Sequence, residues 1–262
     1  MWEIIFLALI AGLGLALSIA VIGNFIVWNR MSYLADSISH SSIIGIALGL
    51  ISPLMPELII IVICFVFSFV IVYLNHKFNI TKEALLIINT QFSVALGITL
   101  ISLLNPNIII NNYFFGNILG VSIKDVICIM ILALLIIMYL IFNWNKILLI
   151  SINEEIAISE RIHALFEKVI FVFLASCAIS FSIKMVGVLL IPSIMIIPSI
   201  IALNVSKTPL ENIVFASIVG FLGISCGILL STIVDVPTGP LITLCLIAFL
   251  IISIIAKKVL AK

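Results

Sequence analysis

Residues 124–142 read KDVICIMILALLIIMYLIF, a run in which every residue after Lys124 and Asp125 is uncharged. A helix needs about 20 predominantly apolar residues to cross the roughly 30 Å hydrocarbon core of a bilayer. This run is long enough for one such crossing. Comparable runs recur along the whole sequence, which predicts an all-α bundle of transmembrane helices surrounded by membrane lipid.

Nine runs can be marked in the 262-residue chain, and they leave no room for a sizeable soluble domain. The sixth and seventh are short, and the seventh contains Pro192 and Pro198, which can break a helix. Eight spans are therefore the alternative. We predict a single transmembrane domain over residues 1–262, with no ATPase domain. The nine runs cover residues 3–22, 32–51, 57–74, 84–103, 124–142, 168–182, 185–202, 212–231 and 239–256.

Composition excludes an ordinary soluble protein, since 65% of the residues are hydrophobic and only 9% are charged. Soluble domains have about 45–50% apolar and 25% charged residues. The net charge of +1 suggests no nucleic-acid partner. All five cysteines lie in apolar runs without a C-x-x-C pair, so we expect them to be small buried side chains rather than cofactor ligands.

The distribution of Lys and Arg predicts the orientation, because cytoplasmic loops carry an excess of these residues. With nine spans and the N-terminus outside, ten of the twelve fall on the inner side. Lys124 and Lys184 remain outside. We therefore predict that the N-terminus is outside and the C-terminus inside, and the inner residues are Arg30, Lys77, Lys82, Lys146, Arg161, Lys168, Lys207, Lys257, Lys258 and Lys262.

The longest inner connection is predicted over residues 143–168. Its central stretch, NEEIAISERIH at Asn153 to His163, interleaves isoleucine with acidic and basic residues. This pattern indicates a short amphipathic helix outside the bilayer. It could be a solvated connector or a docking element for a cytoplasmic partner.

The second run contains RMSYLADSISHSSIIGIALGL, from Arg30 to Leu50. Asp36 and His40 are four residues apart, so on a helix they share one face. Ionisable side chains within a span are costly and usually mark an ion pathway. A carboxylate with an imidazole suits Zn, Mn or Fe(II). The two residues are a candidate metal site, although Asp36 could instead face water near the helix end and His40 could simply hydrogen-bond to it.

A stripe of small residues follows the same helix at four-residue intervals. Small residues at this spacing allow two membrane helices to approach closely. The stripe therefore predicts helix packing, and it consists of Ser37, Ser41, Gly45 and Gly49. The sequence has neither an H-E-x-x-H motif nor a G-x-x-x-x-G-K-[ST] phosphate loop, so we expect no enzyme here and no ATP binding by this chain.

Four stretches resemble the integral membrane permeases of bacterial metal-uptake ABC importers, which serve zinc, manganese and iron. They are MSYLADSISHSSIIGIALGL in the second run, YFFGNILGVS at 113–122, KMVGVLLIPSIMIIPS at 184–199 and DVPTGP at 235–240. The resemblance covers essentially the whole chain. Residues 28–33 and the Phe115–Gly116 pair are most similar to the zinc permeases.

The resemblance implies a bacterial inner-membrane permease that dimerises, docks two cytoplasmic ATPases and receives metal from an extracytoplasmic binding protein. It also implies that Asp36 and His40 line the ion path. The 153–163 segment corresponds to a coupling helix, with the candidate contacts Glu155, Ala157, Glu160 and Arg161.

The chain departs from the family pattern in the fourth run, where Gln91 replaces a histidine of the zinc permeases. It also has Arg161 where the coupling segment usually has glycine, and Leu203 and Asn204 where arginines usually follow the P-S segment. Manganese and iron(II) therefore remain alternative substrates. An ATP-independent transporter would show paired broken helices in two halves, whereas only the segment with Pro192 and Pro198 is broken. A permease for an organic chelate would need no ionic pair.

Overall fold

The structure, a computed structural model, describes residues 2–53, 55–78, 81–104 and 110–260. Within them every regular element is a helix, which confirms the predicted all-α class. Among these described residues, eight helices are long and apolar enough to cross a membrane. In chain order the elements are α1 (Trp2–Leu15), the π-helical segment η1 (Ala16–Ala20), α2 (Val21–Trp28), α3 (Tyr33–Ile51), α4 (Pro56–Phe78), α5 (Lys82–Leu104), α6 (Ile110–Phe115), the 3-10 turn η2 (Ile118–Gly120), α7 (Ile123–Ile152), α8 (Glu154–Ser159), α9 (Ala164–Val186), α10 (Ile191–Val205), α11 (Pro209–Val234) and α12 (Thr238–Leu260).

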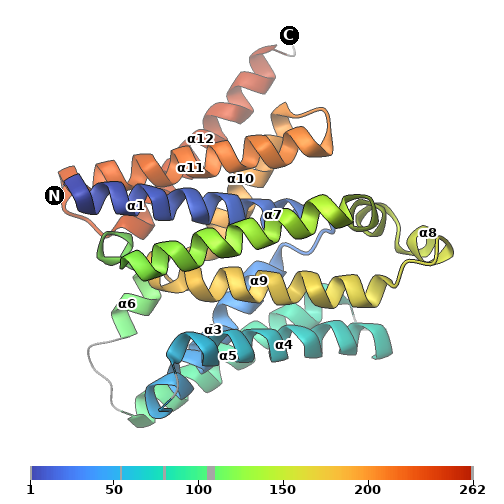
Figure 1. The fold of residues 1–262 in the computed structure, drawn as a ribbon, viewed down its shortest axis with the longest axis horizontal. Coiled ribbons are helices and arrows are strands. Elements are labelled where there is room, and N and C mark those ends of the chain that lie inside the picture. The colour runs from blue at the N-terminus through green and yellow to red at the C-terminus, as the bar shows by residue number, and fades with distance from the viewer. Residues whose placement is uncertain (1, 54, 79–80, 105–109, 261–262) are drawn as a thin grey trace.

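The helices form three groups that lie side by side (Figure 1). The central group contains α1, α2, α7 and α9, and it is flanked by α3–α5 on one side and by α10–α12 on the other. The most extensive packing joins α3 to α4 and α5, while α4 against α9 connects the first flank to the centre. The N-terminus and α8 lie at opposite ends of the long axis.

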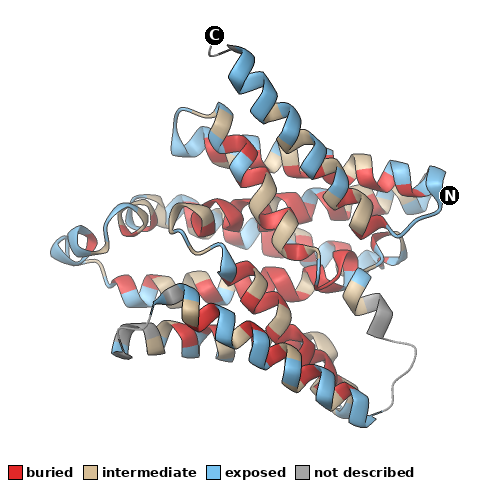
Figure 2. Cartoon of the chain, turned by 180° about the vertical axis from the view of Figure 1, so that it is seen from behind, coloured by how far each residue is buried: buried red, intermediate tan, exposed pale blue. Residues whose placement is uncertain are grey.

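Buried residues gather on the helix faces that meet one another, and exposed residues cover the outside (Figure 2). Much of that outside is apolar: Ile131, Leu134 and Leu135 of α7 are each more than half exposed. An apolar exterior of this extent suits contact with lipid. Cys64 and Cys177 are buried, but Cys128 is exposed on α7, so the expectation that all five cysteines are buried is wrong for Cys128.

The first helix is longer than the predicted run of residues 3–22. It continues without interruption through the π-helical segment η1 to Trp28. Asn24 lies fully buried in this extension and donates its amide to the carbonyl of Ala20 at 3.0 Å. A polar side chain that bonds back to its own helix can be buried at modest cost, which is why the helix outlasts its most hydrophobic stretch.

The expected inner loop of residues 143–168 is mostly helical. Helix α7 continues to Ile152 after a local departure from helical geometry at Asn143 (φ −114°, ψ 18°). Asn153 then caps α8, and α9 begins at Ala164. The prediction of a long loop was wrong because it equated the end of the apolar run with the end of the helix.

The predicted seventh span corresponds to α10, which has only 15 residues. At 1.5 Å per residue such a helix spans roughly 22 Å, less than a bilayer core. It nevertheless connects opposite ends of the bundle, from the end where α9 finishes to the end where α11 begins (Figure 1). The described residues thus contain eight helices long enough to cross a membrane, which matches the alternative of eight spans, and α10 is a shorter apolar helix in addition to them.

Candidate metal-transport site

Helix α3 carries Asp36 and His40, the candidate metal pair, close to its first turn. At the start of this helix, the backbone N–H of Leu34 donates to the carbonyl of Met31 at 2.7 Å. Most of the helix is buried between α4 and α5. The acid and the imidazole are thus carried by one of the most enclosed helices of the bundle.

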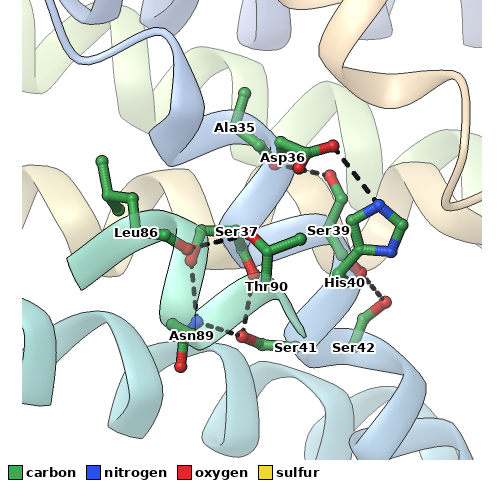
Figure 3. Close-up of polar contacts among 10 residues, drawn as sticks. All are labelled: Ala35, Asp36, Ser37, Ser39, His40, Ser41, Ser42, Leu86, Asn89 and Thr90. Carbon is green, nitrogen blue, oxygen red and sulfur yellow. Dashed lines mark hydrogen bonds and ion pairs between the residues drawn. The ribbon is translucent and has the colours of Figure 1, made fainter. Parts of the chain in front are cut away.

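Asp36 and His40 point toward each other across one turn of α3 (Figure 3). His40 Nε2 lies 3.3 Å from Asp36 Oδ1, and the side chains are 17% and 38% exposed respectively. The other ring nitrogen, Nδ1, is buried and has no hydrogen-bond partner among the described residues. The described residues contain no cluster of three or more His, Cys, Asp or Glu side chains that could hold a metal ion, so this chain brings two such ligands together here.

On a different side of α3, an amide from α5 holds the helix by two hydroxyls (Figure 3). Asn89 Nδ2 donates to Ser37 Oγ at 2.7 Å and to Ser41 Oγ at 3.0 Å. Ser41 Oγ also lies 3.3 Å from Ser93 Oγ. Asn89 fixes the position of the turn that carries the metal pair, and sequence reasoning missed it. The signal was present, because an asparagine inside an apolar run is costly unless it has a partner.

The glycines of the small-residue stripe contact α4 rather than α5. A β-carbon at Gly45 would lie 2.7 Å from Ile60 Cα, and one at Gly49 would lie 3.1 Å from Pro56 Cα. The stripe therefore meets two neighbours, with Ser37 and Ser41 against α5 and the glycines against α4. Gln91, at the position where the resemblance to the zinc permeases implies histidine, is exposed on α5.

Replacing Gly45 by alanine is expected to destabilise the protein by about 1–3 kcal/mol, because the new methyl group would press on the backbone of α4. Gly220→Ala is the matched control, since its β-carbon would meet Ala20 Cβ at an ordinary 3.5 Å. Thermal unfolding of both variants in detergent checks the prediction. Equal unfolding temperatures would contradict the close approach of α3 and α4.

Helix α8 is short and well capped. The Asn153 carboxamide oxygen accepts from the backbone N–H of Glu155 at 2.8 Å and of Ile156 at 3.3 Å. Ala157 is fully buried and packs with Ile150 and Ala164. Of the candidate coupling residues, Glu155 thus lies in the first turn of α8, and Ala157 packs α8 against the neighbouring helices. Glu160 and Arg161 lie just beyond its end and are exposed.

Arg161 has a left-handed backbone with φ of 61°. Glycine, which the resemblance to the metal-uptake permeases implies at this position, adopts such a conformation without steric cost. Arg161→Gly is expected to stabilise the protein by up to about 1 kcal/mol relative to Arg161→Ala. Both variants remove the charge, but only Arg161→Gly relieves the strain of the left-handed backbone. Equal unfolding temperatures for the two variants would show that the backbone at residue 161 is not strained.

At the opposite end of the bundle, three glycines from distant motifs interlock. Gly116 (φ 65°) and Gly187 (φ 92°) face each other, so that a β-carbon at Gly116 would lie 2.3 Å from the carbonyl carbon of Val186. A β-carbon at Gly239 would lie 2.8 Å from the carbonyl oxygens of both Phe115 and Val186. The backbones of Asn117 and Lys184 are also hydrogen-bonded, at 3.1 Å. The backbones around Gly116, Gly187 and Gly239 are therefore packed closely together and form one joint between the three signature stretches.

The sequence matches the ABC 3 transport family over residues 1–257. The chain belongs to that family. It is 36% identical to the high-affinity zinc uptake system membrane protein ZnuB of Buchnera aphidicola subsp. Acyrthosiphon pisum, with 98% of this chain and 99% of the relative covered. The protein of the same name from Haemophilus influenzae is 32% identical, with the same coverage of both chains. Family members of this kind are multi-pass membrane proteins.

The fold of this chain is also similar to that of a solved structure. The structure of PsaBC from Streptococcus pneumoniae in complex with Fab matches with a TM-score of 0.85 and 25% identity. The match covers 94% of this chain and 89% of that chain. The arrangement of helices around α3 is thus that of an ABC permease.

Proposed function

We propose that the chain is the permease subunit of an ATP-binding-cassette importer that moves zinc across the bacterial inner membrane. The observation that carries the proposal is its end-to-end likeness to two zinc uptake membrane proteins, at 36% and 32% identity. Asp36 and His40 provide a fitting contact for the ion. Manganese and iron(II) accept the same two ligand types and are the competing substrates.

The geometry of the pair suits a transient zinc contact. Two ligands that each lie about 2.1 Å from a tetrahedral zinc ion are roughly 3.4 Å apart, close to the 3.3 Å between His40 Nε2 and Asp36 Oδ1. With only these two ligands from one chain, water or a second copy would complete the coordination. Such a site would bind the ion weakly enough to release it. We therefore propose a homodimer that receives zinc from a high-affinity extracytoplasmic binding protein.

ATP hydrolysis is assigned to a partner. The sequence has no phosphate loop, so the proposed importer needs cytoplasmic ATPase subunits that dock at the α8 end. The orientation proposed with this assignment has the N-terminus outside and the C-terminus inside, and it is supported by the ten Lys and Arg residues that the sequence predicts on the inner side. Movement of α8 would then alternate access to the Asp36–His40 pair.

Growth of a deletion strain under zinc chelation tests the function in cells. The strain is expected to need added zinc that the wild type does not need, and plasmid-borne wild-type chain should abolish that need. Restoration by manganese or iron(II) instead of zinc would reassign the substrate. Equal growth of the two strains, with no other zinc importer present, would contradict the proposal.

A further inference from the structure

Glu167 of α9 stands out because it is the only charged side chain that is buried among the described residues, at 8% exposure. A carboxylate in a protein interior is costly unless hydrogen bonds and charges compensate it. Its neighbours should therefore reveal what it holds in place.

Both partners of Glu167 come from α7, and they lie on either side of its bend. Tyr139 Oη donates to Glu167 Oε2 at 2.6 Å, and Lys146 Nζ lies 3.5 Å from Oε1. Between them is Asn143, whose backbone departs from helical geometry. The Asn143 side chain donates to the Tyr139 carbonyl at 3.2 Å and accepts from Lys146 Nζ at 3.1 Å. A change in the bend of α7 would thus pull one of the two donors away from the carboxylate.

The part of α7 beyond the bend leads directly to α8. Lys168, the neighbour of Glu167, pairs with Glu154 at the start of α8, with Nζ to Oε1 at 2.5 Å. Ser151 near the end of α7 accepts from Asn29 Nδ2 at 3.0 Å, which ties this segment to the end of the first membrane helix. On α9, Glu167 therefore contacts both sides of the bend in α7, and Lys168 contacts the start of α8.

A cavity of about 250 Å³ adjoins this cluster, and Glu167, Lys168, Glu154, Ser151 and Asn29 all line it. Close-packed interiors resist movement, whereas unfilled space beside a bend allows the segment to swing. The remaining walls are mainly apolar side chains of α2–α5, α7 and α9. The cavity thus separates the α3–α5 group, which carries the metal pair, from the segment that leads to α8.

We propose that Glu167 is a positioning residue that sets the bend of α7 through Tyr139 and Lys146 and thereby transmits movement of α8 to the membrane core. This inference rests on the proposed function. It assigns to Glu167 a role in coupling rather than in binding the metal, because the carboxylate contacts α7 and not the Asp36–His40 pair.

The test measures zinc uptake per ATP hydrolysed by the complex with its ATPase subunits in proteoliposomes. Glu167→Gln removes the charge, and Tyr139→Phe removes the hydroxyl that holds it. In each variant the ratio is expected to fall by about tenfold, within the range of coupling between distant sites, while ATP hydrolysis per assembled complex stays within about twofold of wild type. Glu3→Gln and Tyr73→Phe make the same chemical changes at exposed positions and should retain the wild-type ratio.

Normalising to assembled complex separates coupling from folding. If Glu167→Gln and Tyr139→Phe only reduce the amount of complex, and the remainder transports zinc at the wild-type ratio, Glu167 is purely structural and the inference is overturned. The losses in the two single variants should not add up in the double variant, since Tyr139 and Glu167 belong to one hydrogen-bonded network. A wild-type complex that moves no zinc would contradict the proposed function itself, which is a different result.

Discussion

Zinc uptake by the Asp36→Asn variant is expected to fall roughly a hundredfold, because the exchange removes the negative charge of one of the two proposed zinc ligands; a hundredfold corresponds to about 3 kcal/mol. The carboxylate faces His40 Nε2 at 3.3 Å, and it is the only acid that pairs with this imidazole among the described residues. Asparagine keeps the shape and one acceptor oxygen but loses the negative charge that would compensate a divalent cation. His40→Ala should reduce uptake to a similar extent by removing the second ligand.

The expected loss is one of transport and not of folding. Asp36 is 38% exposed, so the asparagine side chain at this position stays in partial contact with solvent. Asp125→Asn is the matched control: it removes an ion pair with Lys184 at the other end of the bundle, at 3.0 Å, and should retain most uptake. Uptake is measured against the amount of protein in the membrane. Wild-type uptake by both Asp36→Asn and His40→Ala would exclude the pair from the ion path.

Gly116→Ala is expected to cost about 2–6 kcal/mol in stability and to reduce the folded protein in the membrane severely. The residue combines a left-handed backbone with a contact that leaves no room for a methyl group, and each effect costs about 1–3 kcal/mol. The new β-carbon would lie 2.3 Å from the carbonyl carbon of Val186 and 2.5 Å from the nitrogen of Gly187. Since both neighbours are backbone atoms, no rotamer change can relieve the overlap.

Gly120→Ala is the control in the same segment. Its β-carbon would meet the Asn117 side chain at 3.0 Å, and that side chain can move. The yield of monodisperse protein in detergent, together with its unfolding temperature, distinguishes the two variants. A Gly116→Ala protein as stable as wild type would show that the joint between the Phe115–Gly116 and Gly187 motifs is not close-packed.

Hydrophobicity alone was sufficient to predict the bundle, since every apolar run became a helix. It did not locate the helix ends, because α2 extends to Trp28 and α7 to Ile152, through polar residues. The length of an apolar run matches the thickness of the lipid core. A helix can continue beyond that run as long as its backbone is hydrogen-bonded and its polar side chains have partners. Asn24 and Asn143 find such partners within their own helices.

The proximity of Asp36 and His40 could be predicted from spacing because a four-residue interval fixes two side chains on one helix face. Contacts between helices could not be predicted in this way, since they depend on how each helix is rotated. In the fourth run, Gln91 is exposed, whereas Asn89, two residues earlier, faces α3. Glu167 was overlooked for the same reason, because only the packing of α9 against α7 buries it.

ATP-dependent uptake of zinc by the purified complex tests the central claim most directly. The chain would be reconstituted into proteoliposomes with its ATPase subunits and the zinc-loaded binding protein, and zinc inside would be measured with hydrolysable ATP, with a non-hydrolysable analogue and with competing manganese or iron(II). The account predicts zinc accumulation only when ATP is hydrolysed. Equal accumulation without hydrolysis, or accumulation of manganese or iron(II) but not of zinc, would contradict it.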